Sequence, residues 1–96
     1  MPALLVSLDG NADIPLDQIV VVVGRHRGCN VRIASPRVSR RHCCLAVDRD
    51  GVLVRDLGST HGTRINRQRI EEVVLRLGDE LSIAHYRYRL EGLSRT

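Results

Sequence analysis

Lysine, phenylalanine and tryptophan are absent from this 96-residue chain, and tyrosine occurs only twice, at Tyr86 and Tyr88. So few aromatic rings argue against a surface that stacks nucleic-acid bases, because such surfaces use several aromatic side chains. All fifteen basic residues are arginine and eleven residues are acidic, which leaves a net charge of +4. Arginine suits phosphate and carboxylate ligands. A GC-rich genome produces the same bias, however, so composition alone does not identify a ligand.

The chain also lacks any apolar run near the roughly 20 residues of a membrane helix; its longest run is Ile19–Val23. Its first residues lack the positive charges of a secretory signal. The three cysteines, Cys29, Cys43 and Cys44, contain no Cys-x-x-Cys pair, so neither a zinc nor a redox motif is expected. Cys43 and Cys44 are interpreted as small buried hydrophobic residues. We therefore expect reduced thiols, a cytoplasmic location, and no metal, cofactor or membrane partner.

The length limits the chain to one small domain, since domains typically have roughly 100–150 residues. We expect a single domain over residues 1–96, with its core at about 3–91 and a frayed tail at 92–96. Short apolar segments rich in β-branched residues alternate with turn residues, which is typical of strands and favours an all-β sandwich or barrel. Strands are expected at 3–8, 18–25, 30–33, 41–48, 52–57, 64–66, 68–70, 80–85 and 86–91, while 73–77 is ambiguous between strand and helical turn. An Asp50-Gly51 turn is expected to join two of them as a hairpin.

Polar residues gather in loops or at the ends of these strands, and loops at one end of a sandwich are a natural place for binding. Arg25 and Arg40 supply guanidinium donors, and Ser39 and Thr60 supply hydroxyl groups. Glycines beside them allow backbone N–H groups to approach a ligand. Together these donors suit an anion with three oxygen atoms, namely a phosphate. The four polar clusters are 24–25, 39–42, 58–63 and 78–79.

The order and spacing of these clusters resemble the forkhead-associated (FHA) domain over roughly residues 3–91. The matching residues are Gly24-Arg25, Ser39-x-x-His42, Gly62-Thr63, Asn66 and Gly78-Asp79, within the flanking stretches 38–42 and 56–66. The resemblance implies about eleven strands in two packed sheets, with the binding loops at one end. It also implies a non-catalytic module that binds phosphothreonine segments of proteins phosphorylated by Ser/Thr kinases.

The resemblance assigns a role to several residues. Arg37, two residues before Ser39, matches a position that reads the side chain three residues after the phosphothreonine. Discrimination against phosphoserine is a family trait, attributed to a small apolar slot for the threonine methyl group. The residues that would bind the phosphate are Arg25, Ser39, Arg40 and Thr60.

Gly24, His42 and Gly62 would support the binding loops. His61 departs from the family pattern, which usually has an asparagine whose amide bonds the peptide main chain. A neutral imidazole has one donor and one acceptor, spread around a ring. A protonated His61 would instead attract the phosphate, so the hypothesis is that peptide affinity rises as the pH falls from about 8 to about 6.

Three other functions compete with this one. A hydrolase would need Ser39 and His42 to combine with Asp56 or Asp79, but no Gly-x-Ser-x-Gly elbow accompanies them. The hypothesis of a nucleic-acid-binding domain is supported only by the basic net charge, and no helix-turn-helix pattern is present to strengthen it. An FHA-fold interaction domain that no longer depends on phosphate is the third, and His61 keeps it open. The sequence leaves the oligomeric state and the identity of the partner open.

Overall fold

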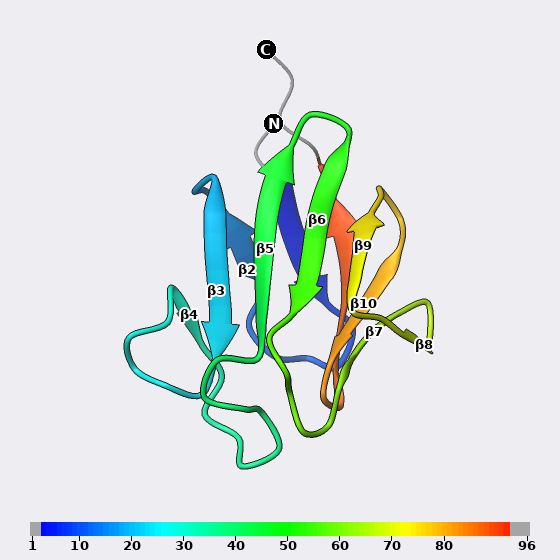
Figure 1. The fold of residues 1–96 in the computed structure, drawn as a ribbon. Helices are drawn as coiled ribbons and strands as arrows, with labels where there is room; N and C mark the ends of the chain where they lie inside the picture. Colours follow the sequence, from blue (N-terminus) through cyan, green and yellow to red (C-terminus); the bar gives the residue numbers. More distant parts are fainter. Residues whose placement is uncertain (1–2, 93–96) are drawn as a thin grey trace.

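The computed structural model describes residues 3–92, and within them it contains eleven strands and no helix. Along β1 the side chains of Ala3 and Leu5 are buried and Leu4 between them is less so, as the two-residue period of a strand requires. The strands form two sheets packed face to face (Figure 1), which confirms the expected all-β sandwich. The strands are β1 (Ala3–Ser7), β2 (Ile14–Leu16), β3 (Val20–Gly24), β4 (Val31–Arg32), β5 (Cys43–Asp48), β6 (Gly51–Asp56), β7 (Thr63–Ile65), β8 (Gln68–Arg69), β9 (Glu72–Leu75), β10 (Glu80–Ile83) and β11 (Tyr86–Glu91).

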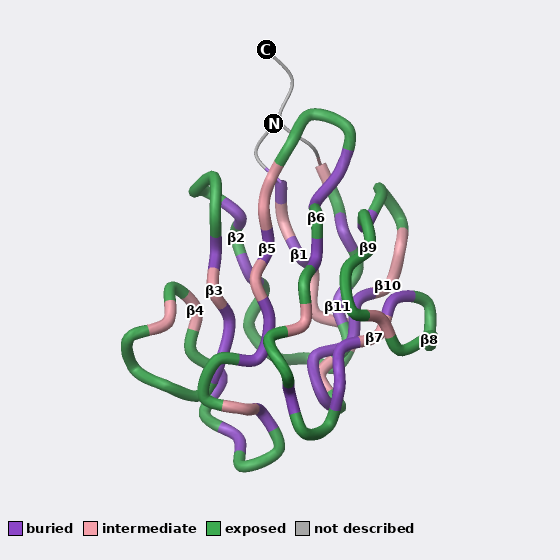
Figure 2. Tube along the Cα trace, viewed as in Figure 1, coloured by how far each residue is buried: buried purple, intermediate pink, exposed green. Residues whose placement is uncertain are grey.

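One sheet has the strand order β2-β1-β11-β10-β7-β8 and the other has the order β4-β3-β5-β6-β9. Of the pairs in the described part of the protein, β3 with β4 is parallel, and the others are antiparallel. Buried residues occur in both sheets and are interspersed with exposed and intermediate ones (Figure 2). Each large apolar side chain buried there contributes roughly 1.5–3 kcal/mol to stability. The largest apolar side chains that are completely buried are Leu5, Leu45, Leu75, Leu81, Ile83 and Leu90.

Two elements differ from the sequence-based expectation. Strand β2 (Ile14–Leu16) was not expected, because Pro15 at its centre normally interrupts a strand. It lies at the edge of its sheet and Pro15 is exposed, a place where the missing N–H group does no harm. Strand β9 (Glu72–Leu75) resolves the ambiguous 73–77 segment, because pairing with β6 holds it extended.

The hairpin of β5 and β6 turns one residue earlier than expected. Asp48 pairs with Gly51, so Arg49 and Asp50 form the turn and Gly51 belongs to β6. A Cβ atom at Gly51 would lie 2.7 Å from the carbonyl oxygen of Leu75 in β9. Gly51 therefore allows β6 and β9 to pack closely. Its position after Asp50 indicated only a turn.

The cysteines behave only partly as expected. All three are free thiols. Cys43 is completely buried, and this burial raises the pKa of its thiol, so that Cys43 behaves as a small apolar residue. Cys44 was expected to be buried too, but it is half-buried, because the next residue of a strand faces the opposite side of the sheet.

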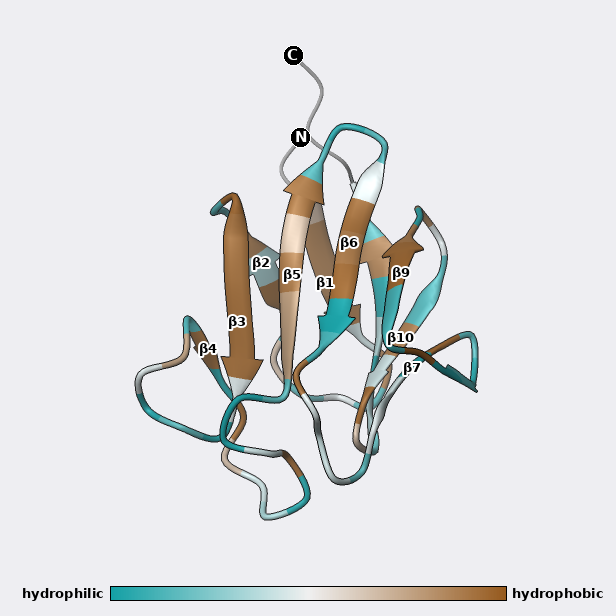
Figure 3. Ribbon diagram, in the orientation of Figure 1, coloured by the Kyte–Doolittle hydropathy of each residue, from teal (hydrophilic) through white to brown (hydrophobic). Residues whose placement is uncertain are grey.

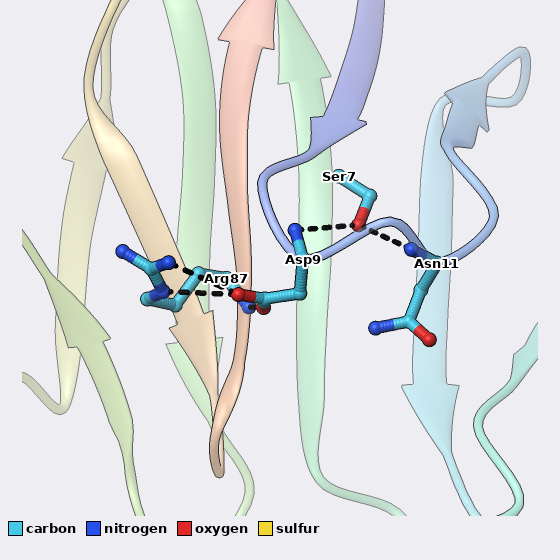
Figure 4. Close-up of polar contacts among 4 residues, drawn as sticks. All are labelled: Ser7, Asp9, Asn11 and Arg87. Atoms are coloured by element: carbon cyan, nitrogen blue, oxygen red, sulfur yellow. Dashed lines mark hydrogen bonds and ion pairs between the residues drawn. The ribbon is translucent and has the colours of Figure 1, made fainter.

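The β1–β2 loop is tied to β11 by Asp9 and Arg87 (Figure 4). One carboxylate oxygen of Asp9 accepts the backbone N–H of Arg87 at 2.8 Å, and the other accepts its guanidinium at 3.0 and 3.2 Å. The backbone hydrogen bond from Arg87 is the main cause that lowers the pKa of Asp9. The hydroxyl oxygen of Ser7 also accepts the N–H groups of Asp9 and Asn11. These contacts close the loop beside the last strand.

Of the expected frayed tail, only Gly92 belongs to the described residues, and 93–96 lie outside them. Residues 3–92 include no helix with the length and apolar character needed to cross a membrane.

Candidate functional site

Three loops lie at one end of the sandwich, opposite the β5–β6 turn (Figure 1). They follow β3, β4 and β6 and cover residues 25–30, 33–42 and 57–62. Strand β3 and most of β5 and β6 are apolar, whereas these loops are mostly hydrophilic (Figure 3). The sequence-predicted phosphate-binding residues all belong to these loops.

The end of β3 lies directly against the β4–β5 loop. The backbone N–H of Arg25 donates to the carbonyl of Ser39 at 2.9 Å, and that of His26 donates to the carbonyl of Arg40 at 3.1 Å. Gly24 is so close to this loop that a Cβ atom would lie 2.1 Å from the carbonyl oxygen of Arg40. Only glycine fits there, and its presence places Arg25 beside Ser39.

The guanidinium of Arg25 is oriented by one hydrogen bond. Its Nε–H donates to the carbonyl oxygen of Val38 at 3.1 Å. Within residues 3–92 its two Nη groups have no hydrogen-bond partner, and the residue is exposed. Arg25 therefore presents two nitrogen atoms to solvent from a fixed stem, which is the geometry that binds a phosphate or carboxylate with two bonds.

Ser39 connects the β4–β5 loop to the β6–β7 loop. Its hydroxyl oxygen accepts the backbone N–H of Thr60 at 3.1 Å. Because the oxygen is the acceptor, the hydroxyl proton of Ser39 remains free to donate. Thr60 itself is exposed. Arg25, Ser39 and Thr60 thus come together from three different loops.

His42 lies beneath these loops and is completely buried. Its Nδ1 accepts the backbone N–H of Ser39 at 3.1 Å, so the ring proton is on Nε2, which donates to the carbonyl of Gly62 at 2.8 Å. Burial lowers the pKa of His42, although the bond to Gly62 acts in the opposite direction. The imidazole is neutral and links the β4–β5 loop to the β6–β7 loop. With both nitrogens engaged by backbone, it has none left for the Ser39 hydroxyl, and the serine–histidine pair of a hydrolase does not form.

Asp56 organises the β6–β7 loop, a role that the sequence analysis missed. One oxygen of its carboxylate accepts the N–H groups of Gly58 and Ser59 at 3.0 Å each. The other accepts the hydroxyl groups of Ser59 and Thr63. Burial alone would raise the pKa of Asp56, but these hydrogen bonds outweigh it and lower the pKa. An aspartate at a strand end, with glycine two and serine three residues after it, was the signal that could have identified this loop-forming turn.

Arg69, to which sequence reasoning gave no site role, supports the same loop. Its Nη2 donates to the carbonyl of Ser59 at 3.3 Å. Gly62 has a φ of +88°, and a Cβ atom there would lie 2.9 Å from Nε of Arg69. The hydroxyl oxygen of Ser59 accepts the N–H of Gly62 at 3.0 Å. The loop that carries Thr60 is therefore fixed from both sides.

The remaining predicted residues are exposed. Arg40 and Arg25 line the same shallow cavity. The backbone N–H of Arg37 donates to the hydroxyl oxygen of Ser35 at 3.3 Å, and the carbonyl of His61 accepts Nη1 of Arg64 at 3.3 Å. Neither the side chain of Arg37 nor that of His61 has a hydrogen-bond partner within residues 3–92.

The amino-acid sequence is similar to several regulatory proteins. It is 36% identical to the glycogen accumulation regulator GarA of Mycobacterium tuberculosis over 72 residues, which cover 75% of this chain and 44% of GarA. It is also 36% identical to the oxoglutarate dehydrogenase inhibitor of Corynebacterium efficiens over 88 residues, 88% of this chain and 62% of that protein. The chain thus spans less than two thirds of the length of either relative.

The fold is similar to solved FHA structures. One, from a study of phosphothreonine-dependent FHA domain interactions, superposes with a TM-score of 0.87 at 27% identity, covering 99% of this chain and 100% of the other. The structure of Mycobacterium tuberculosis EmbR with a phosphopeptide shares the fold at a TM-score of 0.88 and 24% identity, covering 99% of this chain and 25% of EmbR. The family model for the FHA domain matches residues 21–84. The protein belongs to the FHA-domain family.

Proposed function

We propose that this domain binds phosphothreonine-containing segments of proteins that Ser/Thr kinases have phosphorylated, and that it does so without catalysis. The observation that carries the proposal is the meeting of Arg25, Ser39 and Thr60 from three loops. These residues come from three neighbouring loops at one end of the sandwich, and the exposed Arg40, which lines the same cavity as Arg25, adds a second cation. A phosphate, with three terminal oxygens and about −1.5 to −2 charges at pH 7, matches this set.

The peptide on either side of the phosphothreonine would contact the exposed residues around this place. Arg37 would read a residue that follows the phosphothreonine, and His61 would bond the peptide backbone. Both side chains are free of hydrogen bonds within the described residues, so neither has to leave a partner to bind. Gly24, His42 and Gly62 would act only by holding the loops.

A binding role without chemistry agrees with the hydrogen bonds of His42, whose two ring nitrogens are both engaged by backbone groups. The related regulators and the inhibitor point the same way. We propose that residues 1–96 form a single module. We place this module in the cytoplasm, where its three free cysteines would remain reduced.

The test is binding of a peptide library with phosphothreonine, phosphoserine or threonine at its centre. We expect retention of the phosphothreonine peptides, weaker retention of the phosphoserine peptides and none of the unmodified ones. Arg25→Ala should lower the affinity about 10-fold to 100-fold, because a charge-assisted hydrogen bond contributes roughly 1.5–3 kcal/mol. Arg49→Ala, in the β5–β6 turn, removes the same charge at the other end and is the matched control.

Equal retention of all three peptides would contradict the proposal and favour an FHA-fold interaction domain without phosphate dependence. Binding of nucleic acid with a steep salt dependence, unaffected by Arg25→Ala, would favour the nucleic-acid alternative.

A further inference from the structure

Beside the proposed phosphate site lies a cavity of about 870 Å³ that the phosphate does not account for. Arg25 and Arg40 form its border with that site, while Ser39 and Thr60 do not line it. The rest of its polar wall comes from His26, Arg27 and Arg32 in the β3–β4 region and from Ser35 in the β4–β5 loop. The cavity therefore extends away from the two hydroxyl groups toward a second set of donors.

This second set is strongly positive. Arg27 and Arg32 are exposed, as are Arg25 and Arg40, so four guanidinium groups line one cavity and no carboxylate does. Among residues 3–92 the ion pairs are Arg55 with Glu72 and Arg87 with Asp9, and none involves these four arginines. Four positive charges exceed the charge of one phosphate, about −1.5 to −2.

Two of the three side chains of the second set, those of Arg32 and His26, are held in place by the backbone. Nε–H of Arg32 donates to the carbonyl of Arg25 at 2.9 Å, which leaves its two Nη groups for a ligand. Nδ1 of His26 accepts the N–H of Gly28 at 2.9 Å, so in the neutral ring the proton is on Nε2. His26 thus offers a donor whether or not its ring is charged. Both side chains are oriented before any ligand arrives.

A single phosphate would leave these donors without a partner. Two bonds each from Arg25 and Arg40 and one each from the hydroxyl groups of Ser39 and Thr60 already give two donors to each terminal oxygen. His26, Arg27 and Arg32, which are exposed, are therefore available to another acceptor. The chemical group that complements them is a second anion on the same peptide, a carboxylate or a phosphate.

We propose that His26, Arg27 and Arg32 form a second anion subsite, which makes the preferred ligand a phosphothreonine segment with an acidic or phosphorylated residue close to the phosphothreonine. The inference rests on the proposed phosphothreonine binding and specifies its substrate class. The partner would carry at least two negative groups within a few residues. A phosphothreonine in a neutral segment would bind through the first site alone.

The test compares three sets of phosphothreonine peptides by titration calorimetry. In the first set the flanking residues are alanine. In the second, one glutamate replaces an alanine at each position from three residues before to three residues after the phosphothreonine. In the third, phosphoserine takes the place of that glutamate. The measured quantity is the gain, defined as the affinity for an acidic peptide divided by that for the alanine peptide of the same protein.

We expect a gain of about threefold to fivefold at one or two adjacent positions in the wild-type domain, since this corresponds to one favourable exposed charge pair. A larger gain with phosphoserine would identify a phosphate as the second group, and an equal gain would identify a carboxylate. Arg27→Gln and Arg32→Gln should each reduce the gain below about twofold. Arg49→Gln removes the same charge at the far end and should leave the gain intact.

A gain that is absent in the wild type, or that falls equally in Arg27→Gln and Arg49→Gln, would overturn the second subsite while leaving phosphothreonine binding in place. Failure of the alanine peptide and every acidic peptide to bind would instead overturn the proposed function, and the subsite with it. Urea unfolding of each variant identifies any loss of binding that comes from loss of the fold.

Discussion

The hydroxyl oxygen of Ser39 accepts the backbone N–H of Thr60 at 3.1 Å, which joins two loops through residues 21 positions apart in the sequence. In Ser39→Ala the N–H of Thr60 loses this partner, and the phosphate loses a donor. We expect peptide affinity to fall about 10-fold to 100-fold, in line with roughly 1.5–3 kcal/mol for a hydrogen bond to a charged group. Titration calorimetry measures the loss, and an affinity within twofold of the wild type would show that the hydroxyl does not bind phosphate.

The neutral, buried ring of His42 makes stability depend on pH. Its pKa in the folded domain lies below the ordinary value of 6.5, so between these two values the unfolded state binds the additional proton. The contribution of His42 is therefore complete above pH 6.5 and is lost progressively as the pH falls below 6.5. Urea unfolding from pH 7.5 to 5 should show this decline, and ring NMR signals should show His42 neutral at pH 6.5.

The variant His42→Gln is the control for that decline, because its side chain does not titrate. We expect it to be less stable than the wild type by about 2–5 kcal/mol at pH 7, since two buried hydrogen bonds and ring packing are lost. Its unfolding free energy should change less between pH 7 and pH 5.5. An identical pH slope in both proteins would assign the decline to other groups.

Asp56 predicts a second, more acidic transition. Its hydrogen bonds lower its folded-state pKa below the ordinary 3.8, so its stabilisation is present above pH 3.8 and is lost as the pH falls through the lower, folded value. Asp56→Asn should cost about 1–3 kcal/mol at neutral pH, because an amide accepts through one oxygen only. Amide hydrogen exchange should then show faster exchange at Gly58 and Ser59. Unchanged exchange there would contradict the role given to this carboxylate.

The contact between Gly24 and Arg40 predicts a steric effect on the site. Gly24→Ala should destabilise the domain by about 2–3 kcal/mol and lower peptide affinity, because the new methyl group displaces the loop that carries Ser39. Gly10→Ala is the comparison, since Gly10 has a φ of +78° and no atom near its Cβ position. It should cost about 1–2 kcal/mol through backbone strain and leave peptide affinity within twofold. Equal affinity in both variants would contradict the steric argument.

The sequence pattern predicted most strands, because short apolar segments rich in β-branched residues, separated by turn residues, are typical of strands. It placed Arg25 at a strand end and Ser39 and Thr60 in loops, but the contacts among them depend on the paths that the loops take across the end of the sandwich. The hydrogen bonds of Asp56 and Arg69 were missed for the same reason. The cavity beside Arg32 could not be predicted either, because it forms between loop segments, and no periodic sequence pattern indicates how close such segments lie.

The bracing of the loops by His42, Asp56 and the Gly24 contact has a thermodynamic consequence for recognition. The domain has already lost the conformational freedom of its binding loops when it folds, so association does not have to order them again. The entropy lost on binding then comes mainly from the partner segment. Among segments with the same charges, those that are already extended when free should therefore be held longest.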